Sequence, residues 1–495
     1  MAFLFGDSFD LWGTASDAVL SGSIWDTFSL TPSSSITRFS YGKAAVTNNG
    51  GAGIKQNWTA GNSTNTVYFS VGLYQVTGSH AEAYLSLKDG SSFQVTIEWD
   101  LLNNQILVRT GGTAGTVIAT FSSAGLASAI WHGWQGKIVI DGSVGEVHLR
   151  VDGAASDTFS ATGLNTKTTA NSYCNGIQVY GVGQSGGNVY WDDLYVCDSS
   201  GSYENTWPGD LRSWYLLPAG AGSNTQFASQ PQNQSVVGTT STSTAHAANE
   251  LWVGAAWAAS YTGTVTGVTL QLSAGFTGNV NVCLYDNTNS SNAGNVLATA
   301  TAVNNPSAGN VTFTFSSPPS IVKGTSYRIG ILTDASANFN GDASTGAEKK
   351  SSVTYGSFPT NPSGFTTSQH SPYCLVTITP SNWFNASEAA QDGDGTYNYD
   401  ANVGDIDSYA TGGLPSSPSS ITHVQQRMLT CKSDAGARSA QTYLKSGSTV
   451  SLGAGAALAT SYQYQFDQHS VDPNTSAPWE VGAINAAEIG VKVSA

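Results

Sequence analysis

The stretch that decides the fold is residues 131–153, WHGWQGKIVIDGSVGEVHLRVDG. Apolar residues alternate with others along 137–140 and again along 146–151, which is typical of half-buried strands. Asp141-Gly142 between these runs, and Asp152-Gly153 after them, tolerate the positive φ that tight hairpins need. The stretch therefore predicts two antiparallel strands joined by a turn.

Period-two alternation continues on both sides of this hairpin, most clearly in Phe93-Gln-Val-Thr-Ile-Glu-Trp99. We predict strands over 67–73, 83–87, 93–99, 105–109, 116–121, 177–180 and 189–196. The last of these is expected beside the opening segment 4–10. The order of Trp, strand, Gly turn, strand and Asp-Gly in 131–153 resembles the concanavalin-A or laminin-G-like lectin sandwich. That resemblance implies a recognition scaffold with a minority of glycan-cleaving members.

Composition places the whole chain in the all-β class. A chain of 495 residues is too long to fold around a single hydrophobic core of ordinary size, so several domains are expected. Gly occurs 55 times, charged residues make up only 10%, and many short strands are separated by Gly, Ser and Asn turns. The predicted fold class is all-β, as multidomain β-sandwiches: a lectin-like jelly roll, an inserted jelly-roll module and a C-terminal β-sandwich.

The charge balance excludes several functions. A net charge of −15, with 18 Lys and Arg and no basic cluster, argues against binding nucleic acid or an anionic membrane. The N-terminus has neither a cationic start nor an apolar core, so we expect no secretory signal. The sequence contains no run of about 18 apolar residues, so no transmembrane helix is predicted. Five cysteines without CxxC spacing argue against zinc; Cys174 with Cys197 and Cys283 with Cys374 could pair, although buried free thiols are favoured.

Four segments are predicted along the chain. They are a concanavalin-A/laminin-G-like β-sandwich at 1–202, a connector with the first strand of the C-terminal unit at 203–233, an inserted β-sandwich module at 234–380, and a C-terminal β-sandwich at 381–495. The Ser/Thr-rich start of the module, 234–247, has no periodicity and indicates a domain edge. A short helix is expected before the final strand.

An ordered set of segments resembles tailed-phage virion structural proteins with a lectin-like N-terminal half. The matching segments are 5–10, 191–196, 209–212, 217–227, 382–383, 392–397, 432–439 and 484–485. They cover about 1–227 and 381–495, so the intervening module is expected to be an insertion. The resemblance implies a virion component, a tail fibre, spike or surface-decoration subunit, made in the host cytoplasm.

Catalytic and metal motifs are weak. Glu98-Trp-Asp100 places two carboxylates on one face of a strand, but Asn103 stands where lectin-like glucan hydrolases carry a third acid. We therefore predict no enzyme. No cofactor is predicted, although calcium could bind Asp392 and Asp394, or Asp192 and Asp193 near Asp7. Solvated or hydrogen-bonded acids are favoured over calcium at both places.

Glycan-binding residues are predicted from aromatic and short polar side chains. Trp131 and Trp134 flank the hairpin and could stack on sugar rings, while Asp286, Asn287 and Asn289 lie in a loop suited to sugar hydroxyls. The interpretations left open are core packing for the tryptophans and an ordinary polar loop for the others.

The hypothesis that follows is a non-enzymatic phage virion protein that binds host cell-surface glycans through β-sandwich loops. Its expected partners are other virion proteins, a host surface glycan and further copies in a homotrimer. A purely architectural virion protein is the alternative, and a glycan hydrolase is a third.

Overall fold

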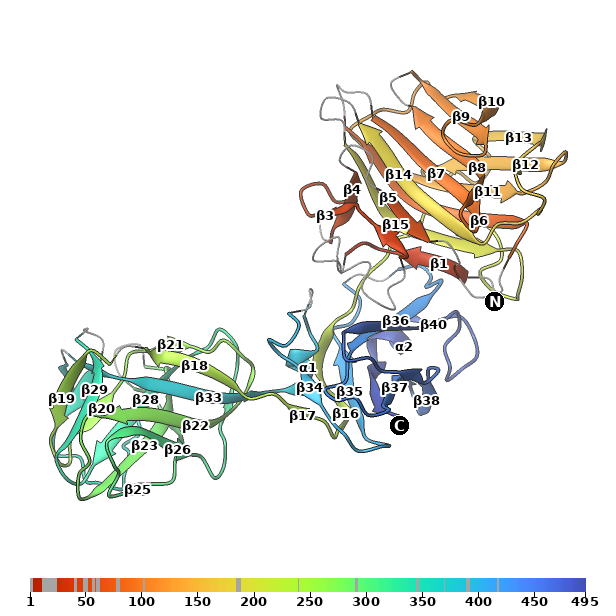
Figure 1. Cartoon of the computed structure of the whole chain (residues 1–495). Helices are drawn as coiled ribbons and strands as arrows, with labels where there is room; N and C mark the ends of the chain where they lie inside the picture. The colour runs from red at the N-terminus through yellow and green to blue at the C-terminus, as the bar shows by residue number, and fades with distance from the viewer. Residues whose placement is uncertain are drawn as a thin grey trace. The chain divides into compact units, whose positions relative to one another are not determined.

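The structure is a computed structural model. It describes residues 3–10, 25–39, 42–47, 52–55, 58, 63–76, 81–100, 103–183, 188–238, 240–289, 293–343, 347–368, 370–388, 392–415 and 418–495. The chain divides into two compact units. Strands make up most of both units (Figure 1). Unit 1 comprises Met1–Leu217, Glu388–Gln391 and Asn402–Ala495; unit 2 comprises Pro218–Ser387 and Asp392–Ala401.

Two antiparallel sheets form the N-terminal sandwich of unit 1. Sheet A has the order β13 (Phe159–Leu164), β12 (Gly145–Val151), β11 (Trp131–Val139), β6 (Thr66–Gln75), β15 (Val189–Asp198), β4 (Ala44–Thr47) and β3 (Thr31–Ser33), with β1 (Phe3–Asp7) beside β15. Sheet B has the order β10 (Thr116–Ser122), β9 (Gln105–Thr110), β8 (Ser92–Asp100), β7 (Ala81–Asp89), β14 (Gly176–Gly183), β5 (Ala52–Lys55) and β2 (Thr27–Phe28). One core lies between them, since buried residues of both sheets form a single cluster.

The hairpin at 131–153 is confirmed as β11 and β12, which pair from Trp134↔Val151 to Val139↔Glu146. Asp152 and Gly153, after the hairpin, have φ of 52° and 76°, as predicted, whereas neither Asp141 nor Gly142 at the turn between the strands has a positive φ. The closing strand is confirmed beside the opening one, with Phe5 opposite Val196 in the β1–β15 pair.

Contacts of the Arg38 guanidinium connect sheet A to the segment after β15. The Arg38 guanidinium, 4% exposed, contacts the Asp193 carboxylate at 3.1 Å and the Leu211 carbonyl at 2.9 Å, and it also pairs with Asp210. A Cβ on Gly133 would lie 2.6 Å from the Arg38 Nη2 atom, so glycine at this position makes room for the guanidinium.

Unit 2 contains a second sandwich. Its sheet C has the order β18 (Gln232–Val237), β33 (Cys374–Pro380), β22 (Gly263–Leu272), β29 (Ala337–Asp342) and β19 (Thr242–His246), joined by β26 (Gly309–Thr314), β27 (Ser320–Ile321) and β32 (Ser371–Pro372). Sheet D has the order β24 (Val296–Thr299), β23 (Asn279–Asp286), β28 (Ser326–Thr333), β20 (Leu251–Val253), β30 (Glu348–Lys350) and β31 (Thr366–Thr367), joined by β21 (Trp257–Ala258) and β25 (Val303–Asn304). Both sheets contribute to one apolar core.

Smaller elements of unit 2 lie outside this sandwich. They are β16 (Pro218–Thr225), the pair β17 (Ala228–Ser229) and β34 (Asn398–Tyr399), and the helix α1 (Asn382–Asn385).

The C-terminal part of unit 1 is again mostly strands. Its elements are β35 (Ile406–Thr411), β36 (Val424–Thr430), β37 (Ser439–Ser446), β38 (Thr449–Leu452), β39 (Ala456–Ala457), β40 (Gln463–His469), α2 (Val481–Asn485) and β41 (Glu488–Val493). The predicted short helix before the last strand is confirmed. The all-β, multi-sandwich fold class is confirmed, and all five cysteines are free thiols. The described residues contain only two helices, of four and five residues, too short to cross a bilayer.

Removal of the Arg38 guanidinium should destabilise the N-terminal sandwich. Arg38→Ala leaves the Asp193 carboxylate, 3% exposed, without its cation, and this should lower the free energy of unfolding by about 3 kcal/mol or more. Urea unfolding followed by tryptophan fluorescence measures the loss. The control is Arg438→Ala, which breaks the exposed Arg438–Asp434 pair and should cost less than about 1 kcal/mol. Equal losses in the two variants would contradict the interpretation.

Candidate functional site

The candidate site lies on the outward face of sheet B, on strand β8. Alternation directs Val95, Ile97 and Trp99 into the core, where each is fully buried. The intervening side chains, Gln94, Thr96, Glu98 and Asp100, therefore point to the other face. These four polar side chains are at most 4% exposed. A strand buried on both faces, with polar groups along one of them, needs a partner for every such group.

Local contacts supply those partners. At one end of β8, the Gln94 amide donates to the Thr169 hydroxyl and to the carbonyls of Asn171 and Tyr173, so the segment 166–173 covers this end. In the middle, the Thr96 hydroxyl is 2.8 Å from Ser86 Oγ and donates to the Gly111 carbonyl. The Gln94 and Thr96 side chains are therefore paired within the sandwich. The other end of the strand carries the acids.

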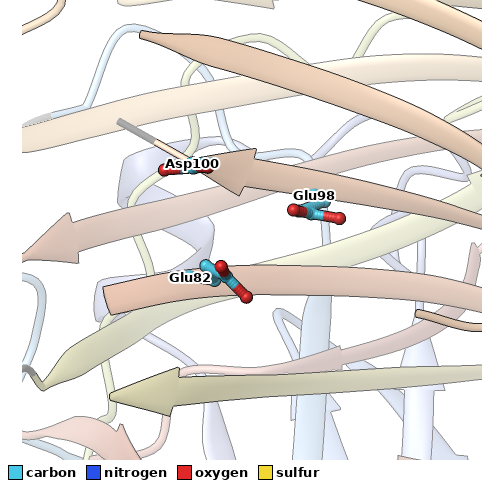
Figure 2. A group of neighbouring side chains, drawn as sticks. All are labelled: Glu82, Glu98 and Asp100. Carbon is cyan, nitrogen blue, oxygen red and sulfur yellow. The ribbon is translucent and has the colours of Figure 1, made fainter. Parts of the chain in front are cut away.

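Three carboxylates gather at that end and form the acidic cluster: Glu82 from β7, and Glu98 and Asp100 from β8 (Figure 2). One oxygen from each lies within 4.8 Å of the others. The pairing of Ala83 with Trp99 brings Glu82 beside Asp100, because the neighbours of a paired residue lie opposite each other on the next row. Register between two strands, rather than spacing along one, builds the cluster.

Each acid has a hydrogen-bond donor. Arg109 Nε donates to Glu98 Oε2 at 2.6 Å, and Asn103 donates to Asp100 from its side chain at 2.6 Å and from its backbone at 3.1 Å. The Tyr84 hydroxyl donates to Glu82. Asn103 stands at the sequence position where a third acid was sought, and it orients Asp100 through these hydrogen bonds. The third carboxylate comes from Glu82.

A stacked tyrosine pair lies beside the acidic cluster. The rings of Tyr84 and Tyr180 are 4.7 Å apart at 11°, and these residues are directly opposite each other across β7 and β14. Tyr84 is also opposite Glu98 in the β7–β8 pair. Burial raises the pKa of Glu98, and the Arg109 contact partly offsets this. The end of the face therefore combines aromatic rings, carboxylates and one guanidinium.

The cluster can be tested as a cation site by its chemistry. Calcium takes six to eight oxygen ligands at about 2.3–2.6 Å, and oxygens within 4.8 Å of one another are compatible with that spacing. However, the oxygens already accept hydrogen bonds from Arg109 and Asn103. A guanidinium this close neutralises charge that a cation would otherwise need, so no metal is assigned to the cluster.

The two tryptophans predicted to bind glycan differ in their surroundings. Trp134 is 1% exposed and packs in the core against Trp99 and Phe159, so the prediction for this residue is wrong. Its ring fills the sandwich interior because alternation along β11 directs it inward. Trp131 is half-buried beside Tyr74 at the start of the same strand. Its role in glycan binding stays a prediction.

The polar loop of unit 2 is held by its own side chains. Asp286 accepts hydrogen bonds from Thr288 and from the backbone and side chain of Asn295. Burial raises the pKa of Asp286, but these hydrogen bonds together outweigh it, so the pKa is lowered. Asn287 Oδ1 accepts from Arg328 Nε at 2.9 Å. Asn289 follows in the same loop, and its glycan contact, like theirs, stays a prediction.

Asp392 and Asp394 are exposed in a turn of unit 2. The Asp392 carboxylate accepts from the backbone and hydroxyl of Thr396, which closes the turn. Neither aspartate belongs to a three-acid group in the described part of the chain. The favoured interpretation, an acidic turn, accounts for the contacts of Asp392, and calcium here stays a prediction.

Asp192 and Asp193 lie at a bulge in β15, where Asp193 has a φ of 51°. Asp193 accepts from Arg38 at 3.1 Å and from the Ser213 backbone at 2.7 Å. Asp192 accepts from the Asp193 backbone at 2.9 Å. Burial first, and then the Asp193 and Asp10 charges, raises the pKa of Asp192 to about 9. Calcium on this pair stays a prediction; a guanidinium already balances Asp193.

A known family matches the part of the chain that contains most of the sandwich of unit 2. Residues 237–384 match a family described as a domain of unknown function (DUF4082). This range falls within unit 2 and covers less than half of the chain. The search of curated proteins found no match.

Several solved structures are similar to part of the chain. The carbohydrate-binding module CBM66 from Bacillus subtilis is 14% identical, over 36% of this chain and 97% of that one, with a TM-score of 0.24. The CBM2 module of the evolved Dit of Lactobacillus casei BL23 phage J-1 is 12% identical, over 43% and 98%, with a TM-score of 0.25. The catalytic domain of a glycoside hydrolase family 131 protein from Coprinopsis cinerea is 11% identical, over 40% and 94%, with a TM-score of 0.28.

Two buried acids, Asp10 and Asp192, should make stability fall as the pH rises from about 4 to 9. Burial, with smaller contributions from the Asp193 and Asp7 charges, raises the pKa of Asp10 to about 7 in the folded chain. A raised pKa means that the folded state binds the proton more tightly, so this stability is complete below about pH 4 and is lost as the pH rises through 7. Asp192 extends the loss toward pH 9.

Calorimetry between pH 5.5 and 9 measures the effect. The thermal midpoint of the chain should fall across this range, and Asp10→Asn should fall less because its amide does not titrate. The rise of the Asp10 pKa from 3.8 to about 7 corresponds to a few kcal/mol of folding free energy over the whole titration. Identical pH profiles for the two proteins would refute the assignment to Asp10.

Proposed function

We propose that this chain is a non-enzymatic virion protein of a tailed phage that binds host surface glycans. The binding site we assign is the acid-bearing end of the outward face of sheet B, where the acidic cluster meets the buried Tyr84 and the partly exposed Tyr180. A tail fibre, a spike and a surface-decoration subunit all agree with this proposal. The single observation that carries the glycan part is the juxtaposition of stacked rings and carboxylates on one rigid sheet.

The chemistry of that face suits a sugar. A tyrosine ring offers an apolar face to the C–H groups of a pyranose and a hydroxyl to its polar groups. Carboxylates and a guanidinium offer acceptors and donors for sugar hydroxyls, and a few fixed polar groups among aromatic ones are typical of small-molecule sites. Because these side chains project from paired strands, little order has to be gained on binding.

The virion part of the proposal rests on the sequence. The ordered segments that resemble tailed-phage structural proteins lie in 1–227 and 381–495, on both sides of the module at 237–384. Assembly into homotrimers and contact with other virion proteins follow from that resemblance.

Glycan hydrolysis is the second candidate, and one observation favours it. Glu82 supplies the third carboxylate that the spacing along β8 lacks, and the raised pKa of Glu98 is what a general acid requires. Against it, the Arg109 guanidinium at 2.6 Å holds Glu98 as a paired carboxylate. Non-catalytic binding is therefore the function that we favour.

Loss of the partly exposed ring should weaken glycan binding. Tyr180→Ala removes the outer ring of the stack, and we expect its Kd for glycans captured by the full chain on an array to rise about tenfold, equivalent to about 1.4 kcal/mol. Tyr180→Phe, which keeps the ring, should stay within threefold. Calorimetric titration with the captured glycan gives both values. An unchanged Kd in Tyr180→Ala would remove the face from consideration.

The same glycan decides between binding and hydrolysis. A non-enzymatic protein releases no reducing ends from it during prolonged incubation, in the chain as it is or in Glu98→Gln. Release that depends on Glu98 would overturn the non-enzymatic proposal and establish the hydrolase. Release that persists in Glu98→Gln would indicate a contaminating activity.

A further inference from the structure

A second pair of aromatic rings lies on the surface of unit 2. Three aromatic side chains are exposed among the described residues, Tyr203, Tyr397 and Tyr399. Tyr399 lies in β34 and Tyr397 directly precedes that strand: Tyr397 is 37% exposed, Tyr399 is 51% exposed, and their ring centroids are 6.0 Å apart at 60°. We call these two residues the tyrosine platform.

The backbone beneath the platform is held firmly. β34 pairs with β17, with Tyr399 opposite Ala228, and the Gln230 backbone donates to the Tyr397 carbonyl at 3.0 Å. Alternation along the strand turns Asn398 inward and the two tyrosines outward, on the same side. The rings are thus displayed by a fixed backbone.

A network of amides fixes the inward side. The Asn385 amide, in a side chain that is 6% exposed, lies 2.8 Å from Ser229 Oγ, 3.2 Å from the Tyr397 carbonyl and 3.0 Å from Asn398 Oδ1. Asn398 in turn donates to the Asn382 carbonyl at 2.8 Å. Buried polar groups of this kind stabilise one geometry of the strand and need no contribution from the exposed rings. Packing therefore does not explain why two large aromatic side chains face solvent here.

Charge narrows the class of ligand. The loop 392–400, DGDGTYNYD, contains three aspartates and no lysine or arginine, and the facing segment 226–234, QFASQPQNQ, contains no charged residue. Carboxylates repel uronic and sialic acids, while amides and tyrosine hydroxyls suit the hydroxyls of uncharged sugars. Rings inclined at 60° offer two differently oriented faces to successive sugar units.

We propose that Tyr397 and Tyr399 form a stacking site for an uncharged oligosaccharide, separate from the face on sheet B. This inference rests on the proposed glycan-binding role and adds a second contact to it. A rigid, amphipathic tyrosine surface binds with little loss of side-chain entropy. A chain with two such sites gains affinity for a polymer that reaches both of them.

The test uses the full chain and four soluble probes: maltohexaose, cellohexaose, chitohexaose and mannohexaose. We expect at least one of them to bind, and its Kd to rise about tenfold or more in the double variant Tyr397→Ala/Tyr399→Ala. Tyr397→Phe/Tyr399→Phe should keep the Kd within threefold because the rings remain. Tyr203→Ala, which removes an exposed tyrosine of unit 1, is the matched control and should not change it.

The outcomes separate this inference from the proposed function. If the Kd of a probe rises in the double alanine variant and is unchanged in Tyr180→Ala, the platform is supported and the proposed site on sheet B is not. The reverse pattern, or binding of none of the four probes, overturns the platform. Light scattering provides the remaining check: if the double variant changes only the mass of the assembly, the rings form a protein interface and the glycan inference is wrong.

Discussion

The rest of the N-terminal sandwich depends on burial of strand β8 from both sides. Val95, Ile97 and Trp99 are fully buried in the core, so every intervening residue is forced onto the opposite face. That face is itself nearly closed to solvent, and each polar group on it must find a partner. Gln94 finds it in the 166–173 segment, and Glu98 finds it in Arg109. The position of the acidic cluster is a consequence of this constraint.

Alternation explains why much of the fold could be predicted from the sequence. The hairpin at 131–153 and the strand at 93–99 each carry their period in adjacent residues, and an Asp-Gly pair marks the turn. These signals are local, so a single sequence contains them. The pairing of β1 with β15 connects the two ends of the sandwich and was predictable because sandwiches of this kind close with their terminal strands.

The candidate site was predicted only in part, because it depends on register. Glu98 and Asp100 share a face by spacing alone, but Glu82 joins them only through the alignment of β7 with β8, in which Ala83 lies opposite Trp99. Nothing in the residues 82–84 signals that alignment, and the strand predicted over 83–87 excluded Glu82. Trp134 was predicted to bind glycan, although the sequence contained the signal against it. Alternation along β11 places it on the same inward side as Ile138, and both side chains are buried.

The two glycan sites that we propose use the same device in different forms. In both, alternation along a strand separates the groups that fix the backbone from the groups that meet a ligand. On sheet B the fixing side is an apolar core, so the outward face can carry carboxylates that need a guanidinium beside them. Neither residue of β34 belongs to an apolar cluster of the described residues, and Asn385 and Asn398 fix the strand through amide hydrogen bonds. This difference affects binding. The buried carboxylates near Arg109 favour a ligand whose own groups form hydrogen bonds with them. The exposed rings of Tyr397 and Tyr399 favour a ligand that covers their apolar surface. A glycan chain offers hydroxyls to the first and C–H faces to the second.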